Sequence, residues 1–179
     1  AQVWPDLRGL SLLGLGFATP YLAPFIGQAE RVIGLMPARQ GVMQWPAEGK
    51  CLTGLVDELE LPLGDESMDR VLVVHGLEAS ESLRGMLRQI WRVLAPGGRV
   101  LIVVSNRRGL WARREATPFG HGQPFSRSQL TQLLRESMFS PSGWEVALFA
   151  PPFDWRPLLR SAAAWERAGH RMAAAVPVA

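Results

Sequence analysis

The fold is decided by one stretch of the sequence, Trp91-Arg92-Val93-Leu94-Ala95-Pro96-Gly97-Gly98-Arg99-Val100-Leu101-Ile102-Val103. An amphipathic helical pattern leads into it and ends at Pro-Gly-Gly, because proline cannot continue a helix and glycine tolerates the left-handed conformation that closes one. The apolar run over residues 100–104 has no polar alternation, which is typical of a strand buried on both faces of a parallel sheet. The stretch therefore predicts an α/β fold.

Strands and helices alternate along the rest of the chain. The predicted strands are residues 10–13, 31–36, 52–56, 69–75, 99–104 and 144–149. The predicted helices are residues 20–26, 82–94, a helix capped by Ser126 and Gln129 that runs through Leu130, Leu133, Leu134 and Met138, and residues 158–172. This alternation predicts a mostly parallel central sheet flanked by helices, with strands 71–74 and 100–104 adjacent and bridged by helix 82–94. Ligands bind such sheets beyond the carboxyl ends of the strands.

Composition narrows the class of protein. With 179 residues, 47% hydrophobic and 20% charged, the chain is expected to form a single soluble domain over residues 1–179. No apolar run is long enough to cross a bilayer and no signal-peptide pattern is visible, which favours a cytoplasmic location and no membrane partner. Cys51 is the only cysteine, so no intrachain disulfide or thiolate metal cage is possible. No metal site is indicated, because His75, His121 and His170 lack ligand spacing.

The basic charge is small. The net charge is +3, and Lys50 is the only lysine among 19 basic residues. This arginine bias is typical of a GC-rich, bacterial-like composition. Binding to nucleic acid needs clustered charge rather than a small excess, so nucleic acid is not an expected partner.

Three segments in the right order resemble one family. They are the Arg-Val-Leu-Ala-Pro-Gly-Gly turn, the segment Asp57-Glu58-Leu59-Glu60-Leu61-Pro62-Leu63 followed by Asp69-Arg70-Val71, and a glycine motif of the form G-x-G-x-A at residues 14–18. Together they resemble class I S-adenosylmethionine-dependent methyltransferases of type 11, over about residues 10–149. The resemblance implies a Rossmann-like methyltransferase fold and S-adenosylmethionine as the cofactor.

The first two strands carry the nearest counterparts of the family's cofactor residues. The residues alone predict either a tight turn or a loop that approaches a ligand closely at Gly14, Gly16 and Ala18. In the family this loop wraps the amino-acid part of the cofactor, although Ala18 stands where a third glycine is usual. Met36 stands where nucleotide-binding folds place an acidic residue for the ribose hydroxyls. Met36 therefore predicts weak or lost cofactor binding.

Further candidates follow the third and fourth strands. The resemblance implies that Asp57 accepts a hydrogen bond from the adenine amino group and that the backbone of Glu58 contacts the ring. Taken alone, without the resemblance, the two residues would be interpreted as part of an exposed acidic loop. His75 ends the fourth strand, which in the family lies beside the cofactor. Its imidazole could serve as a base near neutral pH or could cap the strand by a hydrogen bond.

The segment after the fifth strand is the candidate substrate region. In the family this position commonly contacts substrate, which makes Asn106 and His121 candidate substrate-binding residues. Four arginines and Trp111 in residues 106–114 could contact phosphate, bind a carboxylate or form a solvated loop.

We therefore expect methyl transfer from S-adenosylmethionine to a small-molecule or macromolecular acceptor that the sequence does not identify. Such a transfer depends mainly on proximity and alignment, so no catalytic residue is assigned. The alternative is a catalytically inactive methyltransferase-like interaction subunit, which Met36 and Ala18 favour. An RNA-binding protein is a third alternative, and it rests on the arginine-rich segment alone.

Overall fold

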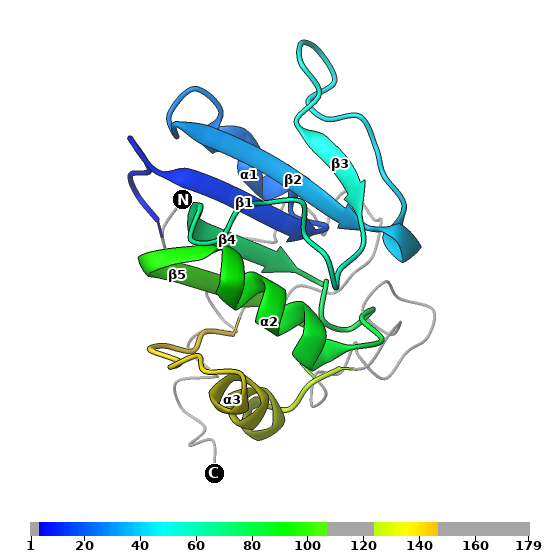
Figure 1. The fold of residues 1–179 in the computed structure, drawn as a ribbon, viewed down its shortest axis with the longest axis vertical. Helices are drawn as coiled ribbons and strands as arrows, with labels where there is room; N and C mark the ends of the chain where they lie inside the picture. The colour runs from blue at the N-terminus through cyan, green and yellow to red at the C-terminus, as the bar shows by residue number, and fades with distance from the viewer. Residues whose placement is uncertain (1–3, 107–123, 147–179) are drawn as a thin grey trace, which may run out of the picture.

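The described residues form a five-stranded sheet in which every neighbouring pair of strands is parallel (Figure 1). The computed structural model describes residues 4–106 and 124–146. The strands are β1 (Ser11–Gly16), β2 (Arg31–Pro37), β3 (Thr53–Val56), β4 (Met68–Val74) and β5 (Leu94–Val103), in the spatial order β3-β2-β1-β4-β5. The chain builds outward from β1 to β3 and then returns to the other side of β1. The β1–β4 boundary is therefore the switch point at which α/β sheets of this kind bind ligands.

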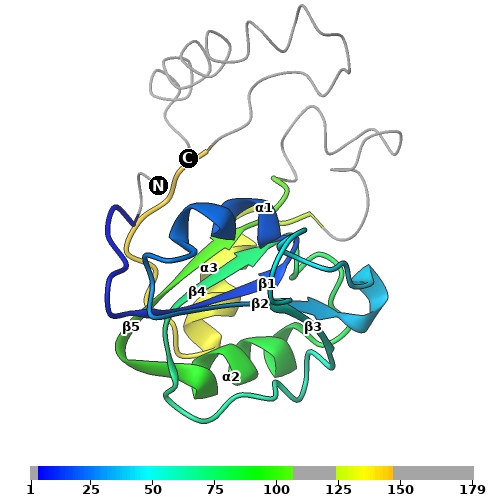
Figure 2. The same cartoon turned by 90° about the horizontal axis from the view of Figure 1, so that it is seen from above.

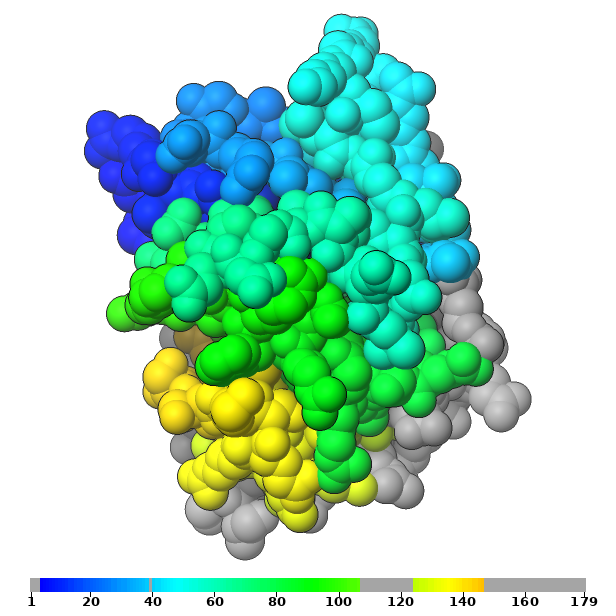
Figure 3. Space-filling model, in the orientation of Figure 1, coloured from blue at the N-terminus to red at the C-terminus, as the bar shows by residue number. Residues whose placement is uncertain are grey.

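Helices cover both faces of the sheet, as Figure 2 shows for α1 and α2. One face is covered by α1 (Thr19–Leu22) and the 3-10 turn η1 (Ala23–Phe25). The other is covered by α2 (Leu83–Val93) and α3 (Arg127–Glu136), which lie side by side in Figure 3. Successive strand residues point to opposite faces, so each central strand feeds both layers. For example, Leu12, Leu72 and Val74 pack under α1, whereas Leu13, Val71 and Val73 pack under α2 and α3.

The central prediction from the sequence is confirmed. β4 and β5 are parallel neighbours, with Val71 paired to Val100 and Val74 to Val103, and α2 connects them. The Pro-Gly-Gly turn is present in a form that the sequence did not predict. β5 begins directly after α2 because Leu94 pairs with Met68, and residues 95–98 then bulge out before pairing resumes between Arg70 and Arg99.

Two element boundaries near the start of the chain were predicted wrongly. β1 runs to Gly16 instead of ending near residue 13, because its glycines belong to the strand. The helix predicted over residues 20–26 begins at Thr19 and becomes 3-10 from Ala23, after four α-helical residues. The capping box of α3 is confirmed, with Ser126 and Gln129 exchanging hydrogen bonds.

The end of α3 also differs from the prediction. Met138 lies past the helix with a φ of 66° and is 66% exposed. The amide of Phe139 donates to the carbonyl of Leu134, and that of Met138 to Arg135, which is a Schellman ending. The left-handed residue at Met138 therefore turns the chain, and Phe139 rather than Met138 packs against the core.

The sixth predicted strand is not formed where the structure describes it. Residues 144–146 have no strand pairing, and the Trp144 ring lies 5.4 Å from the guanidinium of Arg127 instead. Residues 147–149 and the predicted helix 158–172 lie outside the described residues.

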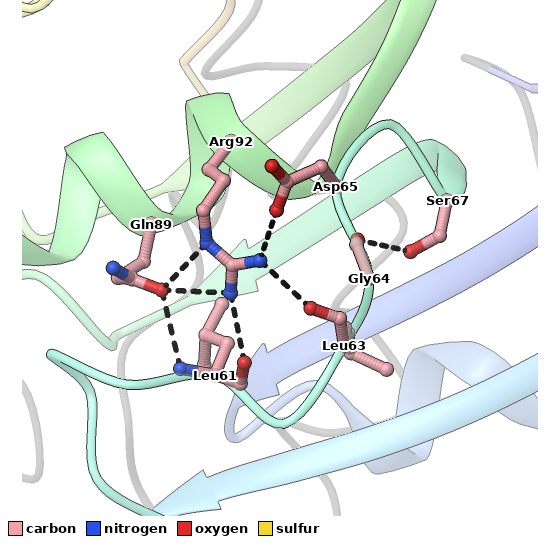
Figure 4. A network of polar contacts seen from close by, with 7 residues as sticks. All are labelled: Leu61, Leu63, Gly64, Asp65, Ser67, Gln89 and Arg92. Carbon is pink, nitrogen blue, oxygen red and sulfur yellow. Dashed lines mark hydrogen bonds and ion pairs between the residues drawn. The ribbon is translucent and has the colours of Figure 1, made fainter.

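Arg92 fastens α2 to the loop that precedes β4 (Figure 4). Its guanidinium donates to the carbonyl oxygens of Leu61 and Leu63, both at 2.8 Å, and pairs with Asp65 at 2.6 Å. Gln89 accepts from Arg92 at 2.9 Å and 3.1 Å through Oε1, which also receives the amide of Leu61. The Arg92 side chain thus joins two of the three segments that carry the family resemblance, the Leu-Pro segment at residues 57–63 and the segment that leads into the Pro-Gly-Gly turn.

The close approach of α1 to β1 can be tested at Gly14. A Cβ at Gly14 would lie 2.6 Å from Leu22 Cδ1 and 2.8 Å from the Cβ of Ala18. We expect Gly14→Ala to lower the free energy of unfolding by about 1–3 kcal/mol, the usual cost of overpacking a core. In the matched control Gly54→Ala the new Cβ would lie 3.6 Å from Leu35 Cδ2, an ordinary contact. Equal urea-unfolding midpoints for the two variants would contradict this packing.

The Arg92 network is tested in the same assay. Arg92→Met keeps the aliphatic stem but leaves the carbonyls of Leu61 and Leu63 without their donor, so the free energy of unfolding should fall by about 2–3 kcal/mol. Arg88→Met is the control, because Arg88 is exposed on the same helix, and its effect should stay within about 0.5 kcal/mol. A loss at Arg92 no larger than that at Arg88 would mean that the network does not stabilise the fold.

Candidate functional site

The candidate site lies at the carboxyl ends of β1 and β4. Gly16 ends β1 with a φ of 74°, and the amide of Phe17 donates to the carbonyl of Val74 at 2.9 Å. A Cβ at Gly16 would lie 2.5 Å from that carbonyl oxygen and 3.2 Å from the Cα of Gly76. Glycine is therefore needed here for both backbone conformation and space.

Gly14 and Ala18 lie behind this edge. Gly14 is inside β1, where it pairs with Gly34 and Leu72. The space of its missing side chain is filled by Leu22 and Ala18, and Ala18 is 1% exposed. These two residues pack α1 against the sheet, and that packing sets the position of the turn at Gly16.

Just past the end of β2 lies the amide side chain of Gln40, whereas nucleotide-binding folds have a carboxylate at this strand end. Met36 is 5% exposed and pairs with Leu55 of β3. The short 3-10 turn η2 (Ala38–Gln40) then brings Gln40 back over the sheet edge, where its Nε2 donates to the carbonyl of His75 at 2.8 Å. Its Oε1 is buried, has no hydrogen-bond partner within residues 4–106 and 124–146, and would lie 3.2 Å from a Cβ at Gly16. Sequence reasoning missed Gln40, because only the geometry of η2 brings it back to this edge.

The loop after β3 contributes Asp57 and Glu58. Asp57 is exposed, and its Oδ1 accepts a hydrogen bond from the amide of Leu59 at 2.8 Å. This bond closes a local turn that holds the carboxylate in place. The Oε1 of Glu58 accepts from the hydroxyl of Ser80 at 2.6 Å and the amide of Glu81 at 3.2 Å. Glu58 therefore ties the β3 loop to the β4 loop through its side chain.

His75 follows β4 and is held by a buried carboxylate. Its φ of 49° is in the left-handed region, where the chain turns sharply. Nδ1 of His75 lies 2.8 Å from Oε1 of Glu78, which also accepts the amide of Ser105 at 2.6 Å. Glu78 is 6% exposed, and its Oε2 has no hydrogen-bond partner in the described chain. The sequence signal for Glu78 was an acidic residue three positions after a histidine in an otherwise apolar strand end, and it was overlooked.

The two substrate candidates have different outcomes. Asn106 is exposed just past β5 and forms a single parallel β-bridge with Phe125, whose amide donates to the carbonyl of Ser105. Asn106 is therefore at the same edge of the sheet as His75. His121 and the arginines from Arg107 onward lie outside the described residues.

The described segments contain neither a metal-binding cluster nor a membrane-spanning helix. In residues 4–106 and 124–146, no three or more His, Cys, Asp or Glu side chains gather in a way that could hold a metal ion. No helix within those ranges is both long enough and apolar enough to cross a bilayer.

Comparisons with known proteins agree with this architecture. Residues 13–102, half of the chain, match the family model described as a methyltransferase domain. A demethylmenaquinone methyltransferase of Lactococcus lactis is 28% identical over an alignment of 143 residues, and the match covers 73% of this chain and 57% of that protein. The chain thus spans little more than half the length of this curated relative.

Solved structures share the fold. An S-adenosylmethionine-dependent methyltransferase from Mesorhizobium loti aligns with 95% of this chain and 90% of its own, at 18% identity and a TM-score of 0.60. One from Archaeoglobus fulgidus aligns with 93% and 82%, at 17% identity and a TM-score of 0.61. The chain therefore belongs to the methyltransferase domain family, and its fold is that of the class I S-adenosylmethionine-dependent methyltransferases.

Proposed function

We propose that this protein transfers the methyl group of S-adenosylmethionine to an acceptor nucleophile. The observation that carries the proposal is the arrangement at the β1–β4 switch point, where the Gly16 turn meets a buried amide oxygen of Gln40 that receives no hydrogen bond from the described part of the chain. A buried acceptor without a partner costs free energy, so a ligand that brings a donor would be favoured there. The family and the fold support the choice of ligand.

The residues present fit this cofactor. The Gly16 turn would receive its amino-acid part, and Oε1 of Gln40 would accept from an ammonium or hydroxyl group. Asp57 has one carboxylate oxygen engaged by Leu59 and would offer the other to the adenine amino group. The backbone of Glu58, fixed by the bonds of its side chain to the β4 loop, would contact the ring.

The cofactor, when bound, supplies a methyl group on a positively charged sulfur, which is already a strong electrophile. The chain's task is to bind the acceptor and align it, a contribution of proximity and orientation. Asn106 at the end of β5, and His121 beyond it, remain the proposed acceptor-binding residues, and the acceptor is a small molecule or a macromolecule. The end of β5, which precedes Asn106, is paired with the end of β4, which suits such alignment.

A second candidate function is an interaction subunit without catalysis. The observation that favours it is Met36, which is buried at the position where a ribose acceptor is expected. Calorimetric titration with S-adenosylmethionine and with its demethylated product separates the two. Saturable binding of both supports the methyltransferase, and no binding of either supports the interaction subunit.

Asp57 gives a direct test of the adenine contact. Asp57→Ala removes a charged acceptor, so the Kd for S-adenosylmethionine should rise about ten- to a hundredfold in the calorimeter. Glu60→Ala is the matched control, because Glu60 is an exposed carboxylate of the same loop with no proposed ligand contact. If both variants bind as the wild type does, Asp57 does not hold the adenine.

Met36 tests the ribose position. Met36→Glu restores an acceptor but buries a carboxylate, so the free protein should melt at a lower temperature than wild type while the cofactor binds more tightly, on the order of tenfold or more. Met36→Leu, which keeps the site apolar, should change neither quantity appreciably. Weaker cofactor binding by Met36→Glu than by Met36→Leu would place the ribose contact elsewhere.

A further inference from the structure

We propose that His75 is the proton acceptor of the reaction and that Glu78 is the residue that positions it. The proposal rests on the methyl transfer proposed above and narrows its substrate class. If a base takes part, the acceptor must carry a proton that it loses on methylation. This condition is met by hydroxyl and thiol groups, by nitrogen nucleophiles that carry an N–H, and by acidic C–H groups. Thioethers and tertiary amines do not meet it.

The contact between the two residues fixes the tautomer of the imidazole. Glu78 is an acceptor when ionised, so the hydrogen on the 2.8 Å contact belongs to Nδ1 of His75. In the neutral ring the lone pair is then on Nε2, which becomes the nitrogen that can take a proton. The same oxygen, Oε1 of Glu78, also accepts the amide of Ser105 at 2.6 Å, and this bond holds the carboxylate in place from the segment just past β5.

A carboxyl group at position 78 offers more than a structural link needs. Two strand ends could be joined by a neutral acceptor such as a glutamine oxygen, which would avoid the cost of burying a carboxylate. Glu78 is nevertheless buried to 4% side-chain exposure, and its Oε2 has no partner in the described chain. A buried negative charge at this distance is useful when the ring becomes positively charged, because it stabilises the imidazolium that proton uptake creates.

His75 stands where an acceptor would approach. Val74, the residue before it, pairs with Gly16 and accepts the amide of Phe17, so the backbone of His75 directly follows the strand end that meets the proposed cofactor turn. The side chain of His75 is 26% exposed, whereas that of Glu78 is 4% exposed. The carbonyl of His75 accepts a hydrogen bond from Gln40, and its amide donates to the carbonyl of Val103. The backbone that carries the ring is therefore fastened on two sides.

The proton balance of the step is simple. The acceptor's nucleophilic atom bonds to the methyl carbon while the bond from that carbon to sulfur breaks and leaves its electron pair on sulfur. The proton of the acceptor passes to Nε2 of His75. The resulting imidazolium, paired with Glu78, then returns the proton to solvent before the next cycle. No oxidant or further reactant is needed.

The first test needs no acceptor. Nitrogen-15 NMR of the histidine side chains should show the neutral ring of His75 with its hydrogen on Nδ1. Glu78→Gln, which keeps an acceptor for the Ser105 amide, is the conservative variant that removes only the charge. A wild-type ring that carries its hydrogen on Nε2 would overturn the proposal whatever the cofactor result.

The second test measures transfer of tritiated methyl from S-adenosylmethionine to catechol and to 1,4-dihydroxynaphthalene, with dimethyl sulfide as the proton-free probe. His75→Asn is chosen because asparagine tolerates the left-handed backbone at this position. It should lower kcat on the protic probes by about 10²–10⁴-fold, the usual contribution of a general base, and remove the acid limb of the pH profile. Glu78→Gln should lower kcat less than His75→Asn does, and neither variant should change the Kd of the demethylated cofactor more than about threefold.

The outcomes are distinct. Wild-type rates in His75→Asn, equal transfer to dimethyl sulfide and catechol, or no transfer to either protic probe by a protein that binds the cofactor would each overturn the proton-acceptor role. A protein that fails to bind the cofactor in the calorimeter would instead overturn the proposed function, and the NMR measurement would still decide the tautomer.

Discussion

The parallel pairing of β1 with β4 is the constraint on which the rest of the site depends. Gly16 and Val74 end their strands at the same level, and the amide of Phe17 closes the gap by bonding to the Val74 carbonyl. This close approach requires glycine, since any Cβ at position 16 would meet that carbonyl oxygen at 2.5 Å. The switch point is therefore bordered by the backbone of β1 and β4, and the glycine at position 16 places no side chain there.

Side chains from neighbouring loops then hold the loop after β4 in place. Gln40 reaches it from beyond β2, Glu58 reaches it from beyond β3, and Glu78 connects it to Ser105 at the end of β5. Each of these bonds spans more than twenty residues of sequence, so the loop is fixed by the whole carboxyl edge. A site held in this way needs little rearrangement to align two reactants, which is the main requirement of methyl transfer.

The parts of the fold that depend on local chemistry were predictable from the sequence. The apolar run at residues 100–104, the capping box at Ser126 and the alternation of strands with helices all rest on neighbours in the chain. The left-handed turn at Met138 and the return of Gln40 through η2 depend on packing, so no residue pattern announced them. Glu78 had a visible signal, but only its burial and its two donors distinguish it from an ordinary exposed acid.

The central claim is that the carboxyl edge around the β1–β4 switch point binds the cofactor. Amide chemical-shift mapping during titration with S-adenosylhomocysteine tests it most directly, because every loop of the edge reports separately. The account predicts shifts at Gly16, Phe17, Gln40, Glu58 and His75, with little change at Ser11, Arg31 and Met68 on the opposite edge. Shifts confined to that opposite edge, or none at saturating ligand, would contradict it.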